Sequence, residues 1–202
     1  MARTVDLSLK QALLDEVVDY LASHGLGVSS LRPMALSLGV STHRLVHHFG
    51  SKAELLDLAL RRAEHLQEIV RVGWVTENPG LSQPDLLRLW WVWLLDRPQN
   101  LALVRLGFEA VSLEATVTGL GVEIRERQIG VWRSIIEDRL LADGLTPDEA
   151  TVEASVTKAV FTGLVMDLLA SGEVARLTAA LEQYLVGLER RLSQDRVRGQ
   201  LP

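Results

Sequence analysis

The stretch of sequence that decides the fold lies at residues 30–52 and reads SLRPMALSLGVSTHRLVHHFGSK. Its first part carries apolar residues at helical spacing behind Ser30, a residue type that caps helix N-termini. Gly39 then provides the backbone freedom for a tight turn, and Ser41 precedes a second amphipathic run that ends at Phe49. The stretch predicts two short helices joined by a glycine turn, a geometry that lays a helix in the major groove of DNA.

Nearly every other segment also carries a helical pattern, so we predict an all-α protein with about nine helices. The capping-box pattern, in which Glu or Gln follows a hydroxyl residue after three positions, begins at Ser8, Ser51 and Thr146. Glycines end several apolar-periodic stretches, at Gly25, Gly39, Gly50, Gly144 and Gly172. The expected helices are residues 8–24, 30–37, 42–48, 51–74, 84–95, 99–116, 121–142, 147–171 and 173–193, with a frayed end from Ser193 onward.

The composition is that of a chain with a substantial core, because 48% of the 202 residues are hydrophobic. The sequence contains no cysteine, which excludes disulfides, thiolate metal sites and a cysteine nucleophile. The longest dense apolar run, residues 89–95, is far shorter than the ~20 residues that span a bilayer. No secretory signal pattern opens the sequence. We therefore expect a cytoplasmic protein with no membrane partner.

The net charge of −5 is unevenly distributed along the chain. Residues 28–62 hold five basic and two acidic side chains, a local charge of +3. Residues 63–202 hold 14 basic and 20 acidic side chains, a local charge of −6. A basic head on an acidic body is oriented toward phosphate by long-range attraction. The distribution supports DNA binding, although the head is only mildly basic.

The quoted stretch resembles the helix-turn-helix of the TetR family of repressors. That family has an Ile-Ala step, a Gly-Val-Ser turn, a Leu-Tyr-x-His-Phe recognition helix and a Ser-Lys pair that opens the next helix. Here the corresponding places hold Met34-Ala35, Gly39-Val40-Ser41, Leu45-Val46-His47-His48-Phe49 and Ser51-Lys52. The resemblance implies a three-helix helix-turn-helix domain at residues 1–55. It also implies a helical domain for ligand binding and dimerisation at residues 56–202.

The resemblance further implies which side chains meet DNA. The residues expected at base edges are Thr42, His43 and Arg44. Those expected at or beside the phosphate backbone are Ser30, Arg32, Val46, His47 and Lys52. The start of a recognition helix points into the groove, and helix N-termini favour phosphate. Arg44 can grip a guanine with two hydrogen bonds, for roughly 1–3 kcal/mol of discrimination between bases.

Some positions depart from the family pattern. His43 stands where the family has a small residue, Arg44 where it has Thr, and Val46 where it has Tyr. The Tyr hydroxyl that contacts phosphate is therefore missing. Pro33 replaces a common acidic residue, in a first helical turn that tolerates proline. These departures leave the fold prediction unchanged, and they predict an operator unlike the family's common ones.

Several residues near the motif have a simpler interpretation. His43 and His47 have the spacing of metal ligands on a helix, but no third ligand lies nearby in the sequence. We therefore expect no metal site and no cofactor. His48 is expected to be a packed, hydrogen-bonded histidine, and Arg61 and Arg62 are expected to form a solvated helix face.

The region from residue 63 to 172 contains no Gly-rich phosphate loop, nucleophile elbow or histidine–carboxylate metal motif. We therefore expect no catalytic residues and no enzyme activity. The resemblance implies a cavity here for a small-molecule effector, and the aromatic content favours an apolar or aromatic compound over a highly charged one. The candidate lining residues are Trp90, Trp93, Phe108, Trp132 and Phe161, with the polar Arg105, Glu109, Gln128 and Asp167. The alternatives are core packing for each aromatic residue and an i,i+4 surface pair for Arg105 and Glu109.

The two C-terminal helices carry apolar stripes that suit self-association. In the TetR family the corresponding helices pair with their twofold mates as a four-helix bundle. The residues expected to contact a second copy are Val156, Ala159, Gly163, Leu177, Leu181, Tyr184 and Leu188. The alternative is that both stripes pack within one chain.

The sequence thus predicts a homodimeric, ligand-responsive transcriptional regulator. We expect it to act as a repressor that binds a near-palindromic operator in double-stranded DNA and is released by its effector. One alternative is a helical protein-interaction module whose helix-turn-helix no longer binds DNA specifically. A helical-bundle enzyme is a second alternative, which leaves the motif at residues 30–52 unexplained.

Overall fold

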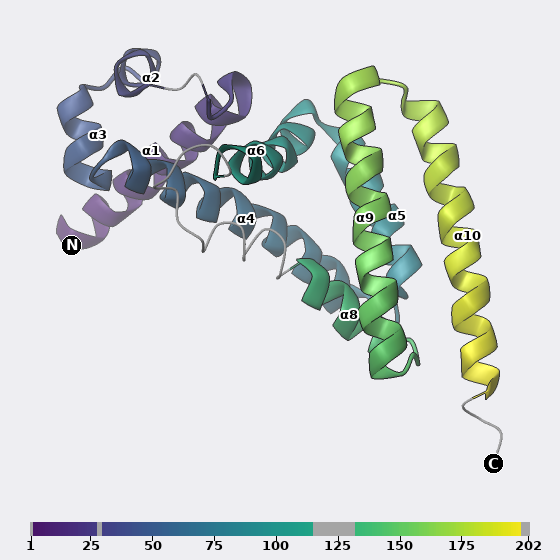
Figure 1. Ribbon diagram of the computed structural model, residues 1–202. Helices are drawn as coiled ribbons and strands as arrows, with labels where there is room; N and C mark the ends of the chain where they lie inside the picture. The colour runs from purple at the N-terminus through teal and green to yellow at the C-terminus, as the bar shows by residue number, and fades with distance from the viewer. Residues whose placement is uncertain (1, 28–29, 115–131, 199–202) are drawn as a thin grey trace. The chain divides into compact units, whose positions relative to one another are not determined.

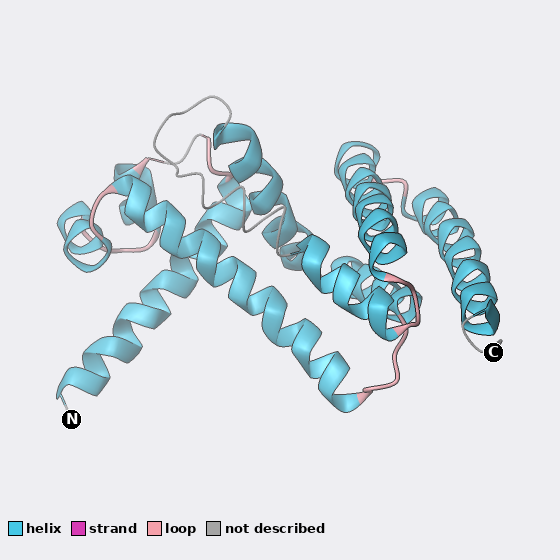
Figure 2. Cartoon of the chain, turned by 60° about the horizontal axis from the view of Figure 1, so that its bottom comes forward, coloured by secondary structure: helices cyan, strands magenta, loops and turns pink. Residues whose placement is uncertain are grey.

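The computed structural model describes residues 2–27, 30–114 and 132–198 (Figure 1). Every regular element in these ranges is an α-helix (Figure 2). The helices are α1 (Ala2–His24), α2 (Leu31–Ser37), α3 (Thr42–Phe49), α4 (Lys52–Glu77), α5 (Gln83–Asp96), α6 (Pro98–Glu114), α8 (Trp132–Ala142), α9 (Pro147–Ser171) and α10 (Val174–Arg198). For the described residues, the prediction of an all-α fold with about nine helices is confirmed.

The local signals for helix starts and stops are largely confirmed. The Ser51 amide donates to Glu54 Oε2 at 2.7 Å, and the Glu54 amide donates to Ser51 Oγ at 3.3 Å. A second capping box joins Thr146 and Glu149 at the start of α9. Each of the five glycines predicted to end a helix has a positive φ, which only glycine adopts without strain.

Two predicted helix ends are wrong. Helix α1 begins at Ala2, so Ser8 lies inside it and does not cap it. No glycine or proline interrupts residues 2–8, and nothing local therefore stops the helix from extending toward the N-terminus. Helix α10 continues to Arg198, past the fraying expected from Ser193. The first part of the predicted helix 121–142 lies outside the described residues.

The chain divides into two compact units. The first unit comprises residues 1–77 and 92–128, and the second comprises residues 78–91 and 129–202. This division follows the packing of the backbone, and the functional boundary expected at residue 55 stays a prediction.

The core of the first unit is formed by α1, α2, α3, α4 and α6. Its buried side chains are mainly aliphatic and include Val17, Leu21, Met34, Leu45, Leu60 and Leu106. Arg62 of α4 also binds Asp15 of α1, with Nε and Oδ1 separated by 2.6 Å. The expectation of a solvated face is therefore wrong for Arg62, whereas Arg61 pairs with Asp57 one turn away at the surface.

Two charged side chains of α6 fasten it to the end of α1. The Leu26 amide donates to Glu109 Oε2 at 2.6 Å, and Arg105 donates to the Ala22 carbonyl oxygen at 2.7 Å. Arg105 and Glu109 also pair with each other at 3.1 Å. The backbone of Gly25 passes so close that a Cβ there would lie 3.0 Å from Glu109 Oε2. The pair thus satisfies backbone groups that the end of α1 leaves without helical partners.

The core of the second unit lies among α8, α9 and α10. Its buried side chains include Ile136, Leu140, Ala150, Ala154, Leu188 and Leu192. The first half of α5 joins this unit through Arg88, which pairs with Glu182 at 2.9 Å and Glu189 at 2.6 Å on α10. These acidic partners raise the pKa of the Arg88 guanidinium, chiefly through the hydrogen bonds that Arg88 donates to Glu182. In this way α5 is held against α10 by charge as well as by apolar contact.

Helix α9 has an unusual composition for a helix of this size. It is long and apolar enough to cross a membrane, and 22% of its most apolar window is buried in this chain. The same length and composition also suit a helix that packs on more than one side in a bundle. The sequence analysis predicted this helix at residues 147–171 but not its membrane-spanning apolarity, because glycine, threonine and lysine interrupt its apolar residues.

A pair of adjacent leucines in α8 tests the core of the second unit. Leu140 is 0% exposed and Leu141 is 39% exposed. We expect Leu140→Ala to lower the free energy of unfolding by roughly 2–5 kcal/mol, because it leaves a cavity among α8, α9 and α10. Leu141→Ala should cost less than about 1 kcal/mol. Urea unfolding followed by circular dichroism measures both, and equal losses would contradict this packing.

The Glu109 contact makes a second prediction. Glu109→Ala removes the acceptor of the Leu26 amide and the acidic partner of Arg105. We therefore expect the free energy of unfolding to fall by about 1–3 kcal/mol. Hydrogen exchange at the Leu26 amide should accelerate in the same variant. Glu16→Ala, which removes an exposed glutamate of α1, is the matched control. An unchanged exchange rate at Leu26 in Glu109→Ala would show that the hydrogen bond does not form.

Candidate nucleic-acid interface and aromatic cluster

Helices α2 and α3 are held by a small shared core. Met34 and Ala35 of α2 and Leu45 and Phe49 of α3 are buried against the first unit. Ser41 stands at the N-cap of α3, and its hydroxyl accepts a hydrogen bond from the Arg44 amide at 3.1 Å. Because only one side of α3 is used in this packing, the other side is left to solvent.

The solvent side of α3 carries most of the residues predicted to meet DNA. Thr42, His43, Arg44, Val46 and His47 are all exposed. The rings of His43 and His47 stack one turn apart, with centroids separated by 6.2 Å. The face therefore combines one permanent charge with side chains that can donate or accept hydrogen bonds.

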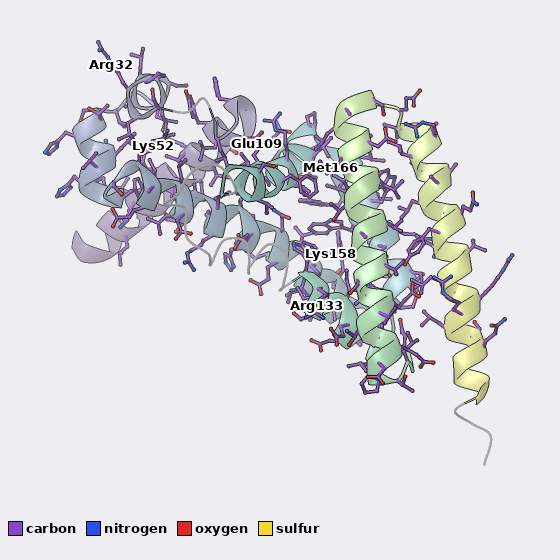
Figure 3. All side chains as sticks on the ribbon, in the orientation of Figure 1. Arg32, Lys52, Glu109, Arg133, Lys158 and Met166 are labelled. Atoms are coloured by element: carbon purple, nitrogen blue, oxygen red, sulfur yellow. The ribbon has the colours of Figure 1, made fainter. Side chains whose placement is uncertain are left out.

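The remaining predicted DNA residues surround this face. Ser30, Arg32 and Lys52 are exposed, and Figure 3 shows Arg32 projecting from α2 and Lys52 at the start of α4. Ser30 occupies the N-cap of α2, but its hydroxyl makes no capping hydrogen bond. The sequence reading was right about the position of Ser30 and wrong about its capping bond.

His48 differs from its two neighbours in α3. It is partly buried, with ring centroids 5.3 Å from His47 and 6.1 Å from Phe49. This packing agrees with the simpler interpretation of His48. Among the residues that the structure describes, no three His, Asp or Glu side chains are grouped to hold a metal ion.

An aromatic cluster, defined as Trp90, Trp91, Trp132 and Phe161, lies in the second unit. The rings of Trp90 and Trp132 have centroids 5.0 Å apart, and those of Trp91 and Phe161 are 6.0 Å apart, edge to face. Trp91 also donates a hydrogen bond from its indole nitrogen to Thr178 Oγ1 at 2.9 Å. Trp90 and Trp91 are buried, whereas Trp132 and Phe161 are partly exposed. The cluster joins α5 to α8, α9 and α10.

The structure brings only some of the predicted effector residues together. Trp90, Trp132 and Phe161 meet in the cluster, and Trp91 is a member that the sequence reading had not selected. Its consecutive position beside Trp90 was the available signal, since neighbouring residues on a helix face different partners.

The other predicted effector residues do not belong to this cluster. Trp93, Arg105, Phe108 and Glu109 belong to the first unit. Asp167 is bound to Arg176 beside the turn between α9 and α10, at 2.9 Å. This hydrogen-bonded pairing lowers the pKa of the Asp167 carboxyl. Gln128 lies outside the described residues. A role in effector binding stays a prediction for all six.

The residues predicted to contact a second copy separate into two groups. Leu177, Leu181 and Leu188 of α10 are 1%, 1% and 0% exposed within a single chain. The packing of one chain already covers them, and their contact with a second copy stays a prediction. The α9 outer face, by contrast, is exposed over five positions: Val152, Val156, Ala159, Gly163 and Met166.

Tyr184 ties α10 to α9 inside the chain. Its hydroxyl lies 2.5 Å from Thr157 Oγ1 and donates to Glu153 Oε1 at 2.9 Å. Arg191 donates to the same Glu153 oxygen at 2.9 Å. Burial raises the pKa of the Tyr184 phenol, so it remains a neutral hydrogen-bond donor. The hydroxyl of Tyr184 is therefore occupied within one chain.

No protein-family model matches the sequence, and no curated protein matches it. Solved structures do match. A transcriptional regulator from Rhodococcus sp. Rha1 is 24% identical, with a TM-score of 0.72 over 89% of this chain and 94% of that chain. A TetR transcriptional regulator from Legionella pneumophila is 13% identical, with a TM-score of 0.72 over 87% and 94% of the two chains. A TetR-family regulator from Agrobacterium tumefaciens is 18% identical, with a TM-score of 0.68 over 87% and 97%. Over most of its length, this chain therefore has the fold of TetR-family transcriptional regulators.

Proposed function

We propose that this chain is a transcriptional regulator of the TetR family that reads DNA with α3. The observation that carries the proposal is the exposed face of α3, formed by Thr42, His43, Arg44 and His47 on a helix fixed by the buried Leu45 and Phe49. A short helix anchored on one side and polar on the other fits the major groove.

The position of each side chain suggests its role. Thr42, His43 and Arg44 form the first turn of α3, which enters the groove first in this geometry. Arg32 and Lys52 are exposed cations on the neighbouring helices and suit phosphates on either side. Ser30, whose hydroxyl does not cap α2, is free to donate to a phosphate oxygen. Val46 offers only an apolar contact, such as a thymine methyl group.

The proposed regulator acts as a homodimer through the α9 outer face. A row of exposed apolar and small residues on a helix this apolar is costly to leave in water. Small residues such as Ala159 and Gly163 allow two helices to approach closely, and no atom lies within 4 Å of a Cβ added to Gly163. Pairing with a second copy gives two α3 helices, which suit half-sites spaced by roughly one or more turns of ~34 Å.

The proposed effector is a small, largely apolar molecule that binds at the aromatic cluster. Trp132 and Phe161 remain partly accessible, so the cluster can offer ring surface to a ligand. An effector that prefers the form with low DNA affinity shifts the population toward it, by no more than its difference in affinity for the two forms. We propose that this shift releases the protein from its operator, so that the regulator is a repressor.

Selection of DNA sequences from a random pool tests the central proposal. We expect the purified protein to enrich a near-palindrome. Arg44→Ala should relax the preference at one base of each half-site, which corresponds to about 1–3 kcal/mol of lost discrimination. Arg190→Ala, at an exposed arginine of α10, is the control and should leave the selected sequence unchanged.

Failure to enrich any sequence at low salt, from folded dimer, would contradict sequence-specific reading. It would favour a protein-interaction module with the same fold. The affinity for the selected DNA should also fall steeply with salt, because each neutralised phosphate releases counterions.

The dimer is tested separately with charge on the α9 outer face. Val156 is 44% exposed, and Val156→Asp places a carboxylate where the second copy is expected. We expect sedimentation to show a monomer with unchanged helix content, and a weaker affinity for the full operator. Ile69→Asp, on α4, introduces the same charge at a residue that is 53% exposed and should leave the dimer intact. A Val156→Asp protein that remains dimeric would show that α9 is not the interface.

A further inference from the structure

Among the residues that the structure describes, Lys158 of α9 has no acidic partner. It is partly buried, and no hydrogen bond or ion pair joins it to another described residue. Burial and the nearby charge of Arg133 both lower the pKa of the Lys158 ammonium. An ammonium that is partly removed from water next to a second cation gains from any anion that binds beside it.

The position of Lys158 relates it to the aromatic cluster. Along α9, Ala154, Lys158, Phe161 and Val165 follow one another at spacings of three and four residues, so they share one face of the helix. Ala154 and Val165 on this face are fully buried, which shows that it points into the second unit. Lys158 therefore lies one turn from Phe161, on the side of α9 that carries the cluster.

Arg133 of α8 is the second cation near Lys158. It follows Trp132 directly, and α8 and α9 pack against each other (Figure 3). Arg133 is already paired with Glu137 of its own helix, at 3.1 Å. Glu137 in turn accepts a hydrogen bond from Thr151 of α9 at 2.6 Å. The three charges of Arg133, Glu137 and Lys158 leave a balance of one positive charge.

We propose that Lys158, assisted by Arg133, holds the single negative charge of an effector whose apolar part packs on Trp132 and Phe161. This inference rests on the proposed effector site and specifies its chemistry. The ligand class is a hydrophobic monoanion, an aromatic or similar apolar group with one carboxylate. One negative charge on the ligand balances the net positive charge of these side chains. A more highly charged ligand leaves an excess of negative charge beside the aromatic rings.

Calorimetric binding of 2-naphthoate and its neutral amide, 2-naphthamide, tests this inference with probes of the same shape. We expect the acid to bind the unmodified protein at least tenfold more tightly than the amide. Lys158→Met should weaken acid binding about tenfold and leave amide binding unchanged. Lys158→Arg should retain the preference for the acid. Equal binding of the two compounds, or no binding of either, would overturn the proposal, as would a full acid preference in Lys158→Met.

Lys52→Met is the matched control, because it removes an exposed lysine at the start of α4. It should weaken DNA binding and leave naphthoate binding unchanged, whereas Lys158→Met should bind the selected DNA normally. The two variants therefore separate the two proposals. If the protein does not bind DNA but binds naphthoate through Lys158, the regulator hypothesis fails and the monoanion site stands. If the protein binds the selected DNA but shows no naphthoate binding through Lys158, the regulator hypothesis stands and the monoanion site is excluded.

Discussion

The end of α1 is the constraint on which the first unit depends, because a helix that stops leaves backbone groups without helical partners. Arg105 and Glu109 supply those partners from α6, to the Ala22 carbonyl and the Leu26 amide. These are charge-assisted hydrogen bonds, roughly twice as strong as neutral ones. These bonds hold α6 to α1, which shares its buried core with α2, α3 and α4. Helix α3, which presents residues to solvent at one side of this core, thus shares the core with α6, a helix distant in sequence.

What the sequence predicted well is local. It includes the caps at Ser41, Ser51 and Thr146 and the glycine stops. Each depends on groups within a few residues of each other, so the local sequence is enough to predict it. The Glu109 contact joins residues 83 positions apart, and no local pattern shows it. An i,i+4 pairing of Arg105 and Glu109 was foreseeable, but their shared attachment to α1 was not.

The apolar stripe of α10 shows a different limit. A row of leucines at helical spacing has the same appearance whether it packs on its own chain or on a second copy. Burial separates the two cases: the leucines of α10 are covered within one chain, while the outer face of α9 is not. The sequence pattern correctly predicted that α9 and α10 pack through apolar faces. Which surface each face packs against could be identified only from the structure. The same holds for Trp91, whose place in the aromatic cluster depends on Phe161 and Thr178.

The composition of α9 also has a consequence for biosynthesis. Its inner face is covered by residues of α10, which follow it in the sequence and are translated later. Helix α8 precedes α9 and covers part of this face, but the part that α10 covers stays open until α10 has left the ribosome, together with the exposed outer face. Transiently exposed surface of this kind makes unfinished chains prone to aggregation and draws chaperones. The interval between the synthesis of α9 and that of α10 is therefore the stage at which this chain is most vulnerable.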